Sequence, residues 1–405
     1  MPNPIYQQES SNRIIQMKKI AIIHDWLTGM RGGEKVLEIF CELFPEADIF
    51  TLIHISGSVS KIIEDRKIQT SFLQKIPLAM KRYRSFLPLF PLAIEGFDLR
   101  GYDVVVSSSH CVAKGALTSP ATIHICYCHT PMRYVWEHYN TYFGNGKKGF
   151  VSRFLMPAIA HYLRMWDVTS SNRVDHFVAN SYNVANRIKK YYKRTADVIH
   201  PPVDCSLYTP TNTHSEGDYY LIVSAFAPYK RIDIAVNAFE KMGLPLVIIG
   251  GGQEEERIRK MAKKHVKCIG WQSSETLKEY YRGCKSLIFP GEEDFGIVPL
   301  EAQACGKPVI AFAKGGVLET VCGIYPYSES TPEMKQKKPE TPTGVFFAEQ
   351  TTESLMEAVR FFERNKNLFD PLSIRRNAEG FDRQIFKEKF KQYVEKLYNK
   401  GLEGG

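Results

Sequence analysis

Short apolar runs that alternate with helical patterns constrain this chain more than any other feature. Each run is uninterrupted and is followed by turn-forming residues, which is typical of parallel strands buried on both faces. Alternation with helices predicts α/β construction with doubly wound, Rossmann-like sheets. The runs form two series, one at 19–23, 47–53, 104–107, 123–127 and 176–179, the other at 220–223, 246–249, 266–269, 286–289 and 308–311.

The two series predict two domains joined by a linker. Two prolines at 201–202 end a strand, and a polar stretch at 209–218 follows. We therefore expect a first domain at 1–204, a second at 205–380 and an amphipathic terminal helix within 381–405. Residues 1–16 are polar, lack the apolar core of a signal peptide and are expected to form a loose extension. Residues 327–343 are polar and lysine-rich, which indicates an exposed loop.

Composition limits the class of protein. A chain of 405 residues, 44% hydrophobic and 24% charged, can form two domains with real cores. It contains no run long and apolar enough for a transmembrane helix. The nine cysteines are odd in number and scattered, which favours reduced cytosolic thiols over disulfides. Cys126 and Cys128, next to His129, are too closely spaced for a zinc site, so no metal is predicted.

The positive charge is concentrated in the first half. Residues 1–204 hold 25 Lys and Arg against 17 Asp and Glu, whereas the remainder holds 28 against 27. Such a half can attract nucleic acid, an anionic membrane or an anionic substrate. No nucleic-acid-binding motif is present, so we expect no nucleic-acid partner. Residues 75–84 mix cations with apolar residues that continue to Leu92, which fits either a membrane-surface anchor or a basic helix followed by core.

A strand, loop and helix at 286–305 form the most specific candidate site. The apolar strand 286–289 is followed by a proline and a glycine, and a helix is predicted from Ile297 to residue 305. The backbone N–H groups of Gly296, Ile297 and Val298 would then be free donors at a helix N-terminus, where a phosphate can bind.

Two carboxylates lie in the same stretch, Glu293 in the loop and Glu301 in the helix. Carboxylates beside an anion site repel the anion unless they bind something else, and sugar hydroxyls are natural partners. The stretch therefore predicts a sugar nucleotide as ligand. Two solvated glutamates on an ordinary strand-loop-helix unit are the simpler alternative.

The spacing Glu293-x7-Glu301, in the local form E-D-F-G-I-V-P-L-E-A, resembles the signature of family 4 retaining glycosyltransferases. This resemblance implies the GT-B fold, in which two Rossmann-like domains face each other across a cleft. It also implies that the second domain binds the donor and that the terminal helix crosses back onto the first domain. In that arrangement Glu301 holds ribose hydroxyls, Glu293 holds sugar hydroxyls, and the helix amides meet the phosphates.

Lys230 follows the first strand of the second domain and is placed to meet a diphosphate leaving group. The family carries an arginine and a lysine here, but the arginine position is Ala225. Either Lys230 acts alone or Arg231 supplies the second charge. Gly252 ends a glycine run at 250–252 that allows close approach of a nucleotide, although Glu255 breaks the dinucleotide-binding spacing and disfavours hydride chemistry.

In the first domain, Gly32 and Gly33 lie between the first strand and its helix, where the resemblance implies a loop facing acceptor and donor. Asp25 ends the same strand and is an acceptor-side candidate. His110 is a weaker acceptor-side candidate in a serine-rich segment after another strand. The turn Asn180-Ser181 fits a family motif and a simple helix cap equally well.

His129 lies in C-H-T-P-M-R-Y-V-W, which follows a predicted strand. The segment is similar to one in bacterial O-antigen and polysaccharide mannosyltransferases. This similarity implies that His129 bonds a sugar hydroxyl or the bridging oxygen, and that the reaction is catalysed by His129, Glu293 and Lys230.

These resemblances imply a metal-independent, retaining glycosyltransferase that needs no cofactor. It would move mannose from GDP-mannose to a growing, lipid-linked glycan in cell-surface polysaccharide (lipopolysaccharide) synthesis. We expect a cytoplasmic enzyme with peripheral contact to the inner face of an anionic membrane. The alternatives are a UDP-sugar donor, a GT-B-like sugar-nucleotide epimerase and a non-catalytic protein that binds nucleotide sugars.

Overall fold

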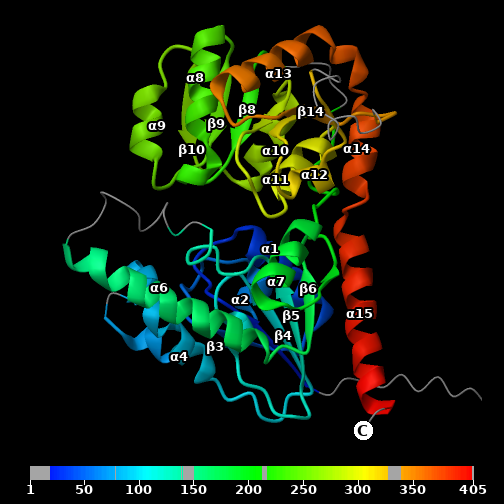
Figure 1. Ribbon diagram of the computed structural model, residues 1–405. Coiled ribbons are helices and arrows are strands. Elements are labelled where there is room, and N and C mark those ends of the chain that lie inside the picture. The colour runs from blue at the N-terminus through cyan, green and yellow to red at the C-terminus, as the bar shows by residue number, and fades with distance from the viewer. Residues whose placement is uncertain are drawn as a thin grey trace, which may run out of the picture.

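The computed structural model describes residues 19–77, 79–137, 139, 150–211, 217–326 and 339–403. Within this part the chain forms two stacked α/β units, each built on a seven-stranded parallel sheet (Figure 1). The expected extension at 1–16 lies outside the described residues, as does the stretch 327–338 of the predicted exposed loop.

The first sheet has the order β3-β2-β1-β4-β5-β6-β7. Its strands are β1 (Ile20–His24), β2 (Asp48–Thr51), β3 (Ile68–Thr70), β4 (Val104–Ser109), β5 (Ile123–Cys128), β6 (His176–Ala179) and β7 (Asp197–Val198). Its α-helices are α1 (Gly32–Leu43), α2 (Lys61–Glu64), α3 (Ala79–Arg82), α4 (Phe90–Glu95), α6 (Phe150–Ser171) and α7 (Tyr182–Tyr192). Short 3₁₀ turns are η1 (Phe72–Lys75), η2 (Tyr83–Leu89) and η3 (Ala113–Gly115).

The second sheet has the order β10-β9-β8-β11-β12-β14-β13. Its strands are β8 (Tyr220–Val223), β9 (Leu246–Ile249), β10 (Val266–Gly270), β11 (Leu287–Phe289), β12 (Val309–Phe312), β13 (Gly323–Ile324) and β14 (Gly344–Phe347). The helical elements are η4 (Pro228–Lys230), α8 (Ile232–Met242), α9 (Glu255–Met261), α10 (Ser274–Gly283), α11 (Ile297–Ala304), α12 (Val317–Thr320), α13 (Thr352–Arg364), η6 (Lys366–Leu368), α14 (Pro371–Glu379) and α15 (Arg383–Glu403).

These sheets confirm the predicted doubly wound α/β class. The strands in the centre of each sheet coincide with the apolar runs of the sequence. Every residue of β4 is buried, as expected for a strand covered on both faces. Strands β3, β13 and β14 were not predicted, and β3 and β13 are only three and two residues long. Strand β7 lies just before the prolines at 201–202 that were expected to end a strand. Helix α1 begins at Gly32, so Gly32 and Gly33, which were expected to lie before the helix, belong to its first turn.

Each sheet has a topological switch point, which is where ligands bind in open parallel sheets. In the first sheet the chain winds outward in both directions from β1 and β4, and in the second from β8 and β11. Gly32 at the start of α1 lies against Ile297 at the start of α11, since a Cβ added at Gly32 would be 3.3 Å from Ile297 Cδ1. The two switch points therefore face each other across the domain interface.

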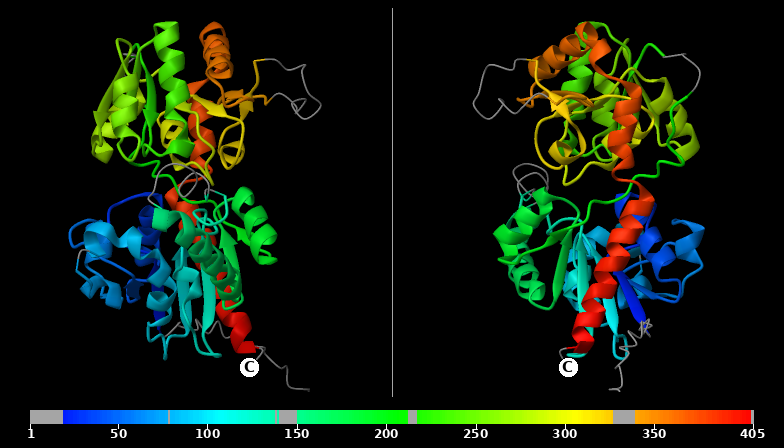
Figure 2. Two further views of the ribbon diagram at one scale, coloured as in Figure 1. Left: turned by 60° about the vertical axis from the view of Figure 1, so that its left-hand side comes forward. Right: turned by 90° about the vertical axis from the view of Figure 1, so that its right-hand side faces the viewer.

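The terminal helix α15 leaves the second domain and runs along the first (Figure 2). Its buried side chains Phe386, Phe390 and Val394 join the apolar cluster formed by β1, α1 and β5. The ring centroids of Phe390 and of Phe40 in α1 are 4.4 Å apart. Part of the first domain's core is therefore contributed by the last residues of the chain.

The two segments that cross between the domains are hydrogen bonded to each other. The backbone N–H of Val203 donates to the carbonyl of Phe381 at 2.9 Å, and the N–H of Arg383 donates to the carbonyl of Val203 at 3.1 Å. The domain boundary expected at 204/205 lies in the first of these crossings. No helix in the described part of the chain is long and apolar enough to cross a membrane.

We expect Phe390→Ala to destabilise the protein by about 3–5 kcal/mol, because it removes a buried ring and leaves a cavity against Phe40. Urea-induced unfolding followed by circular dichroism measures this change. Leu372→Ala, in α14, is the matched control, since Leu372 is 63% exposed and its loss should cost less than about 0.5 kcal/mol. Equal effects of the two substitutions would contradict the packing of α15 on the first domain.

Candidate active site

Lys230 and Glu293 meet at the switch point of the second sheet. Lys230 ends η4, which follows β8, and Glu293 follows β11, so adjacent strands deliver the two side chains. They form an ion pair through Lys230 Nζ and Glu293 Oε1. Gly291 allows this approach, because a Cβ at that position would lie 2.8 Å from the Cα of Lys230. A larger residue would push the two loops apart.

The Lys230 ammonium is charged despite its burial. Burial lowers the pKa of Lys230, but the charge of Glu293 outweighs it and raises the pKa above the usual value. A permanent cation is thereby held at the carboxyl edge of the sheet, where it can stabilise negative charge on a leaving group.

Helix α11 begins beside this ion pair. Its N-cap Gly296 has φ of +92°, a left-handed conformation that favours glycine. The first residues of the helix, Ile297 and Val298, lie on the side that faces the first domain, as the contact of Ile297 with Gly32 shows. The predicted phosphate-binding amides of Gly296–Val298 are therefore next to the domain interface.

Glu301 lies one turn further along α11 and is almost completely buried. The Lys35 ammonium of α1 donates to Glu301 Oε1 at 2.6 Å, and the Tyr281 hydroxyl donates to Oε2 at 2.7 Å. The charge of Glu301 raises the pKa of Lys35, which favours its charged ammonium form. Both carboxylates of the Glu293-x7-Glu301 signature thus have a lysine partner, one from the same domain and one from the other.

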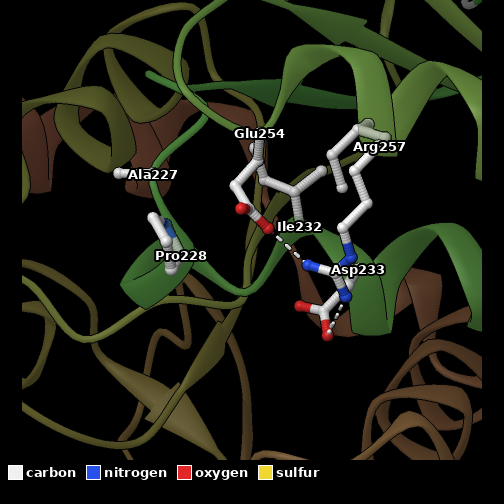
Figure 3. Close-up of a pocket in the computed structure, with 7 residues that line it drawn as sticks. Ala227, Pro228, Ile232, Asp233, Glu254 and Arg257 are labelled. Carbon is white, nitrogen blue, oxygen red and sulfur yellow. Dashed lines mark hydrogen bonds and ion pairs between the residues drawn. The ribbon is translucent and has the colours of Figure 1, made fainter. Parts of the chain in front are cut away.

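Arg231 is held beside Lys230 by its own contacts. It has a left-handed backbone, with φ of +51°, and its guanidinium donates to Asp233 at 3.1 Å and to Gln350 at 3.4 Å. Asp233 also pairs with Arg257 at 3.6 Å, next to a cavity of about 10 Å³ (Figure 3). That cavity holds about one water molecule and cannot hold a nucleotide.

The glycine run after β9 brings protein backbones together. A Cβ at Gly250 would lie 1.9 Å from the carbonyl oxygen of Ser224, and one at Gly252 would lie 3.1 Å from the N atom of Phe226. Both glycines have positive φ, +135° and +147°. The sequence pattern was interpreted as allowing close approach of a nucleotide. In the structure these glycines allow close approach of the loop after β8, which leads to Lys230.

In the first domain, His129 follows β5 and belongs to a buried chain of hydrogen bonds. His129 Nε2 is 2.9 Å from Ser108 Oγ, and Ser108 Oγ is 3.0 Å from His24 Nδ1. A Cβ at Gly33 would lie 3.5 Å from His24 Cε1 and 3.7 Å from His129 Nε2. The glycine therefore lets the start of α1 pass directly over both rings.

Asp25 is fully buried and acts on its surroundings through His110. Its carboxylate accepts four backbone N–H groups, from residues 110–113, at 2.6–2.9 Å. It also lies 3.0 Å from His110 Nδ1. Burial raises the pKa of Asp25, but the charge and hydrogen bond of His110 lower it to well below the usual value. Asp25 itself cannot touch a ligand, whereas the partly exposed His110 can.

His129 and His110 lie close together, and their pKa values are shifted in opposite directions. Burial, followed by the charges of His110 and His24, lowers the pKa of His129 to about 3, so its imidazole is neutral. Burial lowers the pKa of His110, but the charge of Asp25 raises it more, which favours the imidazolium. Their ring centroids are 6.5 Å apart. The site thus combines a neutral hydrogen-bonding ring with a nearby cation.

The structure brings the sequence-predicted residues into two groups. The switch point of the second domain is lined by Lys230, Arg231, Glu293, Glu301 and Gly296–Val298. The switch point of the first domain is lined by His129, His110, Asp25, Gly32 and Gly33. Sequence reasoning did not single out Lys35, Tyr281, His24 or Ser108. Of these, Lys35 could have been predicted from the sequence, because it lies two residues after Gly33 and the start of α1 was expected to face the donor.

The fold and this site define a GT-B glycosyltransferase, and comparisons with known proteins give the family. Residues 31–207 match the family model described as Glycosyltransferase Family 4, and residues 210–379 match that of Glycosyl transferases group 1. The chain therefore belongs to the family 4 glycosyltransferases.

Three relatives are glycosyltransferases at low identity. A glycosyltransferase of Methanocaldococcus jannaschii is 27% identical over 55% of this chain and 59% of its own length. The alpha-1,3/1,6-mannosyltransferase ALG2 of Saccharomyces cerevisiae is 24% identical over 82% of this chain and 73% of its own. The O-antigen chain mannosyltransferase C of Escherichia coli is 31% identical over 34% of this chain and 42% of its own.

Two solved structures share the fold at low identity. Sucrose-phosphate synthase from Thermosynechococcus elongatus has a TM-score of 0.68 with 17% identity, over 94% of this chain and 100% of its own. Anabaena HepE, solved with UDP-glucose, has a TM-score of 0.66 with 14% identity, over 93% of this chain and 99% of its own.

We expect the two histidines to titrate differently. The NMR signal of the His129 ring should stay constant from pH 5 to 8, whereas that of His110 should still change above pH 6.5, with assignments from His129→Gln and His110→Gln. Because unfolded His129 binds a proton at about pH 6.5, its burial costs stability as the pH falls below that value. The contribution of His110 has the opposite sign and is lost as the pH rises through its raised pKa. A His129 midpoint above pH 5 would contradict this arrangement.

Proposed function

We propose that this enzyme is a retaining glycosyltransferase that moves mannose from GDP-mannose to a growing glycan. The observation that carries the proposal is the Lys230–Glu293 ion pair, which lies beside Glu301 and the start of α11 at the edge of the sheet. Mannose as the sugar is supported by the names of two relatives, both mannosyltransferases. GDP as the nucleotide rests on the sequence resemblance around His129.

In this proposal the donor binds to the second domain. Ribose hydroxyls take the place of Lys35 at Glu301, which already accepts two hydrogen bonds there. The diphosphate takes the place of Glu293 at Lys230 and meets the amides of Gly296–Val298. Glu293 is thereby released to bond hydroxyls of the sugar. In each of these ion pairs, the substrate would thus replace one partner and bind the other.

The chemistry follows from these positions. Lys230 and the helix amides stabilise the charge that develops on the departing diphosphate, and Arg231 adds a second cation if its contact with Asp233 is exchanged. The departing phosphate removes the proton of the acceptor hydroxyl on the same face of the sugar, so no protein nucleophile is required. The neutral imidazole of His129 can bond a sugar hydroxyl without adding charge. These side chains supply the cationic stabilisation that a metal would otherwise provide.

A UDP-sugar donor is the main alternative, and the HepE structure with UDP-glucose supports it by fold alone. An epimerase would use the same donor site without an acceptor. A non-catalytic binding protein is suggested only by Ala225 at the family's arginine position. The ion-paired Lys230, Glu293 and Glu301 favour catalysis over that alternative.

The acceptor is proposed to be lipid-linked, with the first domain touching an anionic membrane. Around η1, α3, η2 and α4 the apolar side chains of Phe72, Met80, Leu89 and Leu92 are exposed. The cations Lys75, Arg82 and Arg84 in the same segment are exposed as well. Such a mixture of cations and apolar side chains suits a membrane surface. None of the nine cysteines, all of which lie in the described residues, forms a disulfide, which fits work in the cytoplasm.

Calorimetric titration with GDP, UDP and GDP-mannose tests the donor. We expect GDP and GDP-mannose to bind, and Glu301→Gln to weaken both by about 10–100-fold, because a hydrogen bond to a charged group contributes about 1.5–3 kcal/mol. Glu256→Gln, on the exposed face of α9, is the control and should leave affinity unchanged. Preference for UDP would contradict mannose transfer from GDP, and no binding of any nucleotide would contradict the proposed function.

Flotation with anionic vesicles tests the membrane contact. We expect the protein to float at low salt and to be released at high salt, because cations contribute much of the attraction. Leu92→Glu should reduce flotation several-fold, since Leu92 is 61% exposed in the basic segment. Leu372→Glu places the same charge on the second domain and should have no effect. Absence of flotation at low salt would contradict the membrane contact.

A further inference from the structure

The side chain of Asp294, the residue after Glu293, is held by the first domain. Its Oδ2 accepts a hydrogen bond from Arg133 Nη1 at 2.9 Å, and its Oδ1 forms an ion pair with Arg187 of α7. Asp294 is in the second domain, whereas both arginines belong to the first. The loop that carries Glu293 is therefore tied across the interface at the next residue.

The backbone of Asp294 is held from the same side. Its carbonyl accepts a hydrogen bond from Ser181 Oγ at 2.7 Å, and the side-chain amide of Asn183 lies 3.5 Å away. The side chain and the backbone carbonyl of Asp294 thus both bind residues of the first domain. This arrangement restrains the position and the direction of the loop, and not merely its distance from the first domain.

The turn that binds Asp294 also binds His129. The Asn180 side-chain amide donates to the carbonyl of His129 at 2.9 Å, and Ser181 follows Asn180 directly. Two consecutive residues therefore connect the histidine of the first domain with the carboxylate loop of the second. Ser181 also caps α7 by accepting a hydrogen bond from the N–H of Val184. The capping role and the bridging role of this turn occur together.

Arg133 also contacts the loop that carries Lys230, the partner of Glu293. The Arg133 guanidinium lies 5.4 Å from the ring centroid of Tyr229, the residue before Lys230. Arg133 thus contacts the chain neighbours of both Lys230 and Glu293. It packs over Tyr229 while its charge meets Asp294, so one side chain touches both loops of the switch point.

Burial makes this cluster stronger than an ordinary surface ion pair. The side chains of Arg133, Arg187 and Asp294 are only 10–16% exposed. Glu137 pairs with Arg187 at 2.7 Å and with Arg133 at 3.6 Å, which helps to balance the two cations. Networks of partly buried, mutually paired charges hold a defined geometry, whereas isolated surface pairs contribute little.

We propose that Asp294 is a positioning residue that, through Arg133, Arg187 and the Asn180-Ser181 turn, holds Glu293 opposite His129 across the domain interface. This inference rests on the proposed function, because it assigns Asp294 a part in sugar transfer. Asp294 needs no contact with the substrate to do this. It sets the relative placement of two groups that come from different domains.

Asp294→Asn tests the proposal, since it keeps the size and the carbonyl contacts of the residue but removes its charge. We expect kcat to fall about 10–100-fold, because small misplacement of reacting groups is costly. The Kd for GDP, measured by calorimetry, should change less than about threefold, because the proposed contacts to ribose and diphosphate come from the second domain. A kcat within twofold of the wild type would overturn the proposal.

Two further variants separate positioning from general stability. Glu42→Gln removes an ion-paired carboxylate that contacts Arg383 and Lys387 of α15, away from the Glu293 loop, and should leave kcat unchanged. Arg187→Met should reproduce the kcat loss of Asp294→Asn, and the double variant should lose little more than either single one. A comparable kcat loss in Glu42→Gln, or additive losses in the double variant, would overturn the proposal.

Small-angle X-ray scattering provides a readout that does not depend on the donor. Without nucleotide, Asp294→Asn should have a larger radius of gyration than the wild type, and Glu42→Gln should not. An unchanged radius in Asp294→Asn would overturn the bridging role. Failure of the wild type to bind any nucleotide sugar would instead refute the proposed function, and the scattering comparison would still show whether Asp294 joins the domains.

Discussion

Opposed carboxyl ends of two parallel sheets are the constraint on which the rest of this structure depends. Parallel strands need helical crossovers, and the crossovers leave an open point only where the winding reverses. In this enzyme both reversals face the same interface, at β1/β4 and at β8/β11. Two backbone crossings, at Val203 and at Phe381–Arg383, connect the domains, and α15 packs on the first domain. Every candidate catalytic group follows from this placement.

Charge at the interface is balanced residue by residue. Glu293 is paired with Lys230, Glu301 with Lys35, and Asp294 with two arginines. A carboxylate buried without a partner would be costly, because desolvation disfavours the charged form. The same requirement explains how a polar substrate could enter, since its hydroxyls and phosphates offer equivalent partners. The site is therefore stable without ligand and suited to exchange its internal contacts for contacts with a ligand.

Much of the fold was predictable because its signals are local. Runs such as 220–223 and 246–249 show buried strands by composition alone, and Gly296 before an apolar helix indicated the start of α11. The short edge strand β13 was not predictable, because two residues carry no periodicity and form a strand only beside a longer neighbour. Within the site, Glu293, Glu301, Lys230 and His129 were named from motifs, whereas Lys35 and Tyr281 were not, since their partner Glu301 is distant in the chain.

By itself the sequence determined two α/β domains, the carboxylate pair on a strand-loop-helix unit and the family resemblance, because each depends on residues close together in the chain. Only the tertiary structure decided the directions in which the pKa values of His110 and His129 are shifted, since these depend on burial and on neighbours from other strands. It also decided that the buried Asp25 pairs with His110 and that Asp294 contacts the first domain. The physical reason is that electrostatic interactions depend on distance and burial in space, which separation along the chain does not reveal.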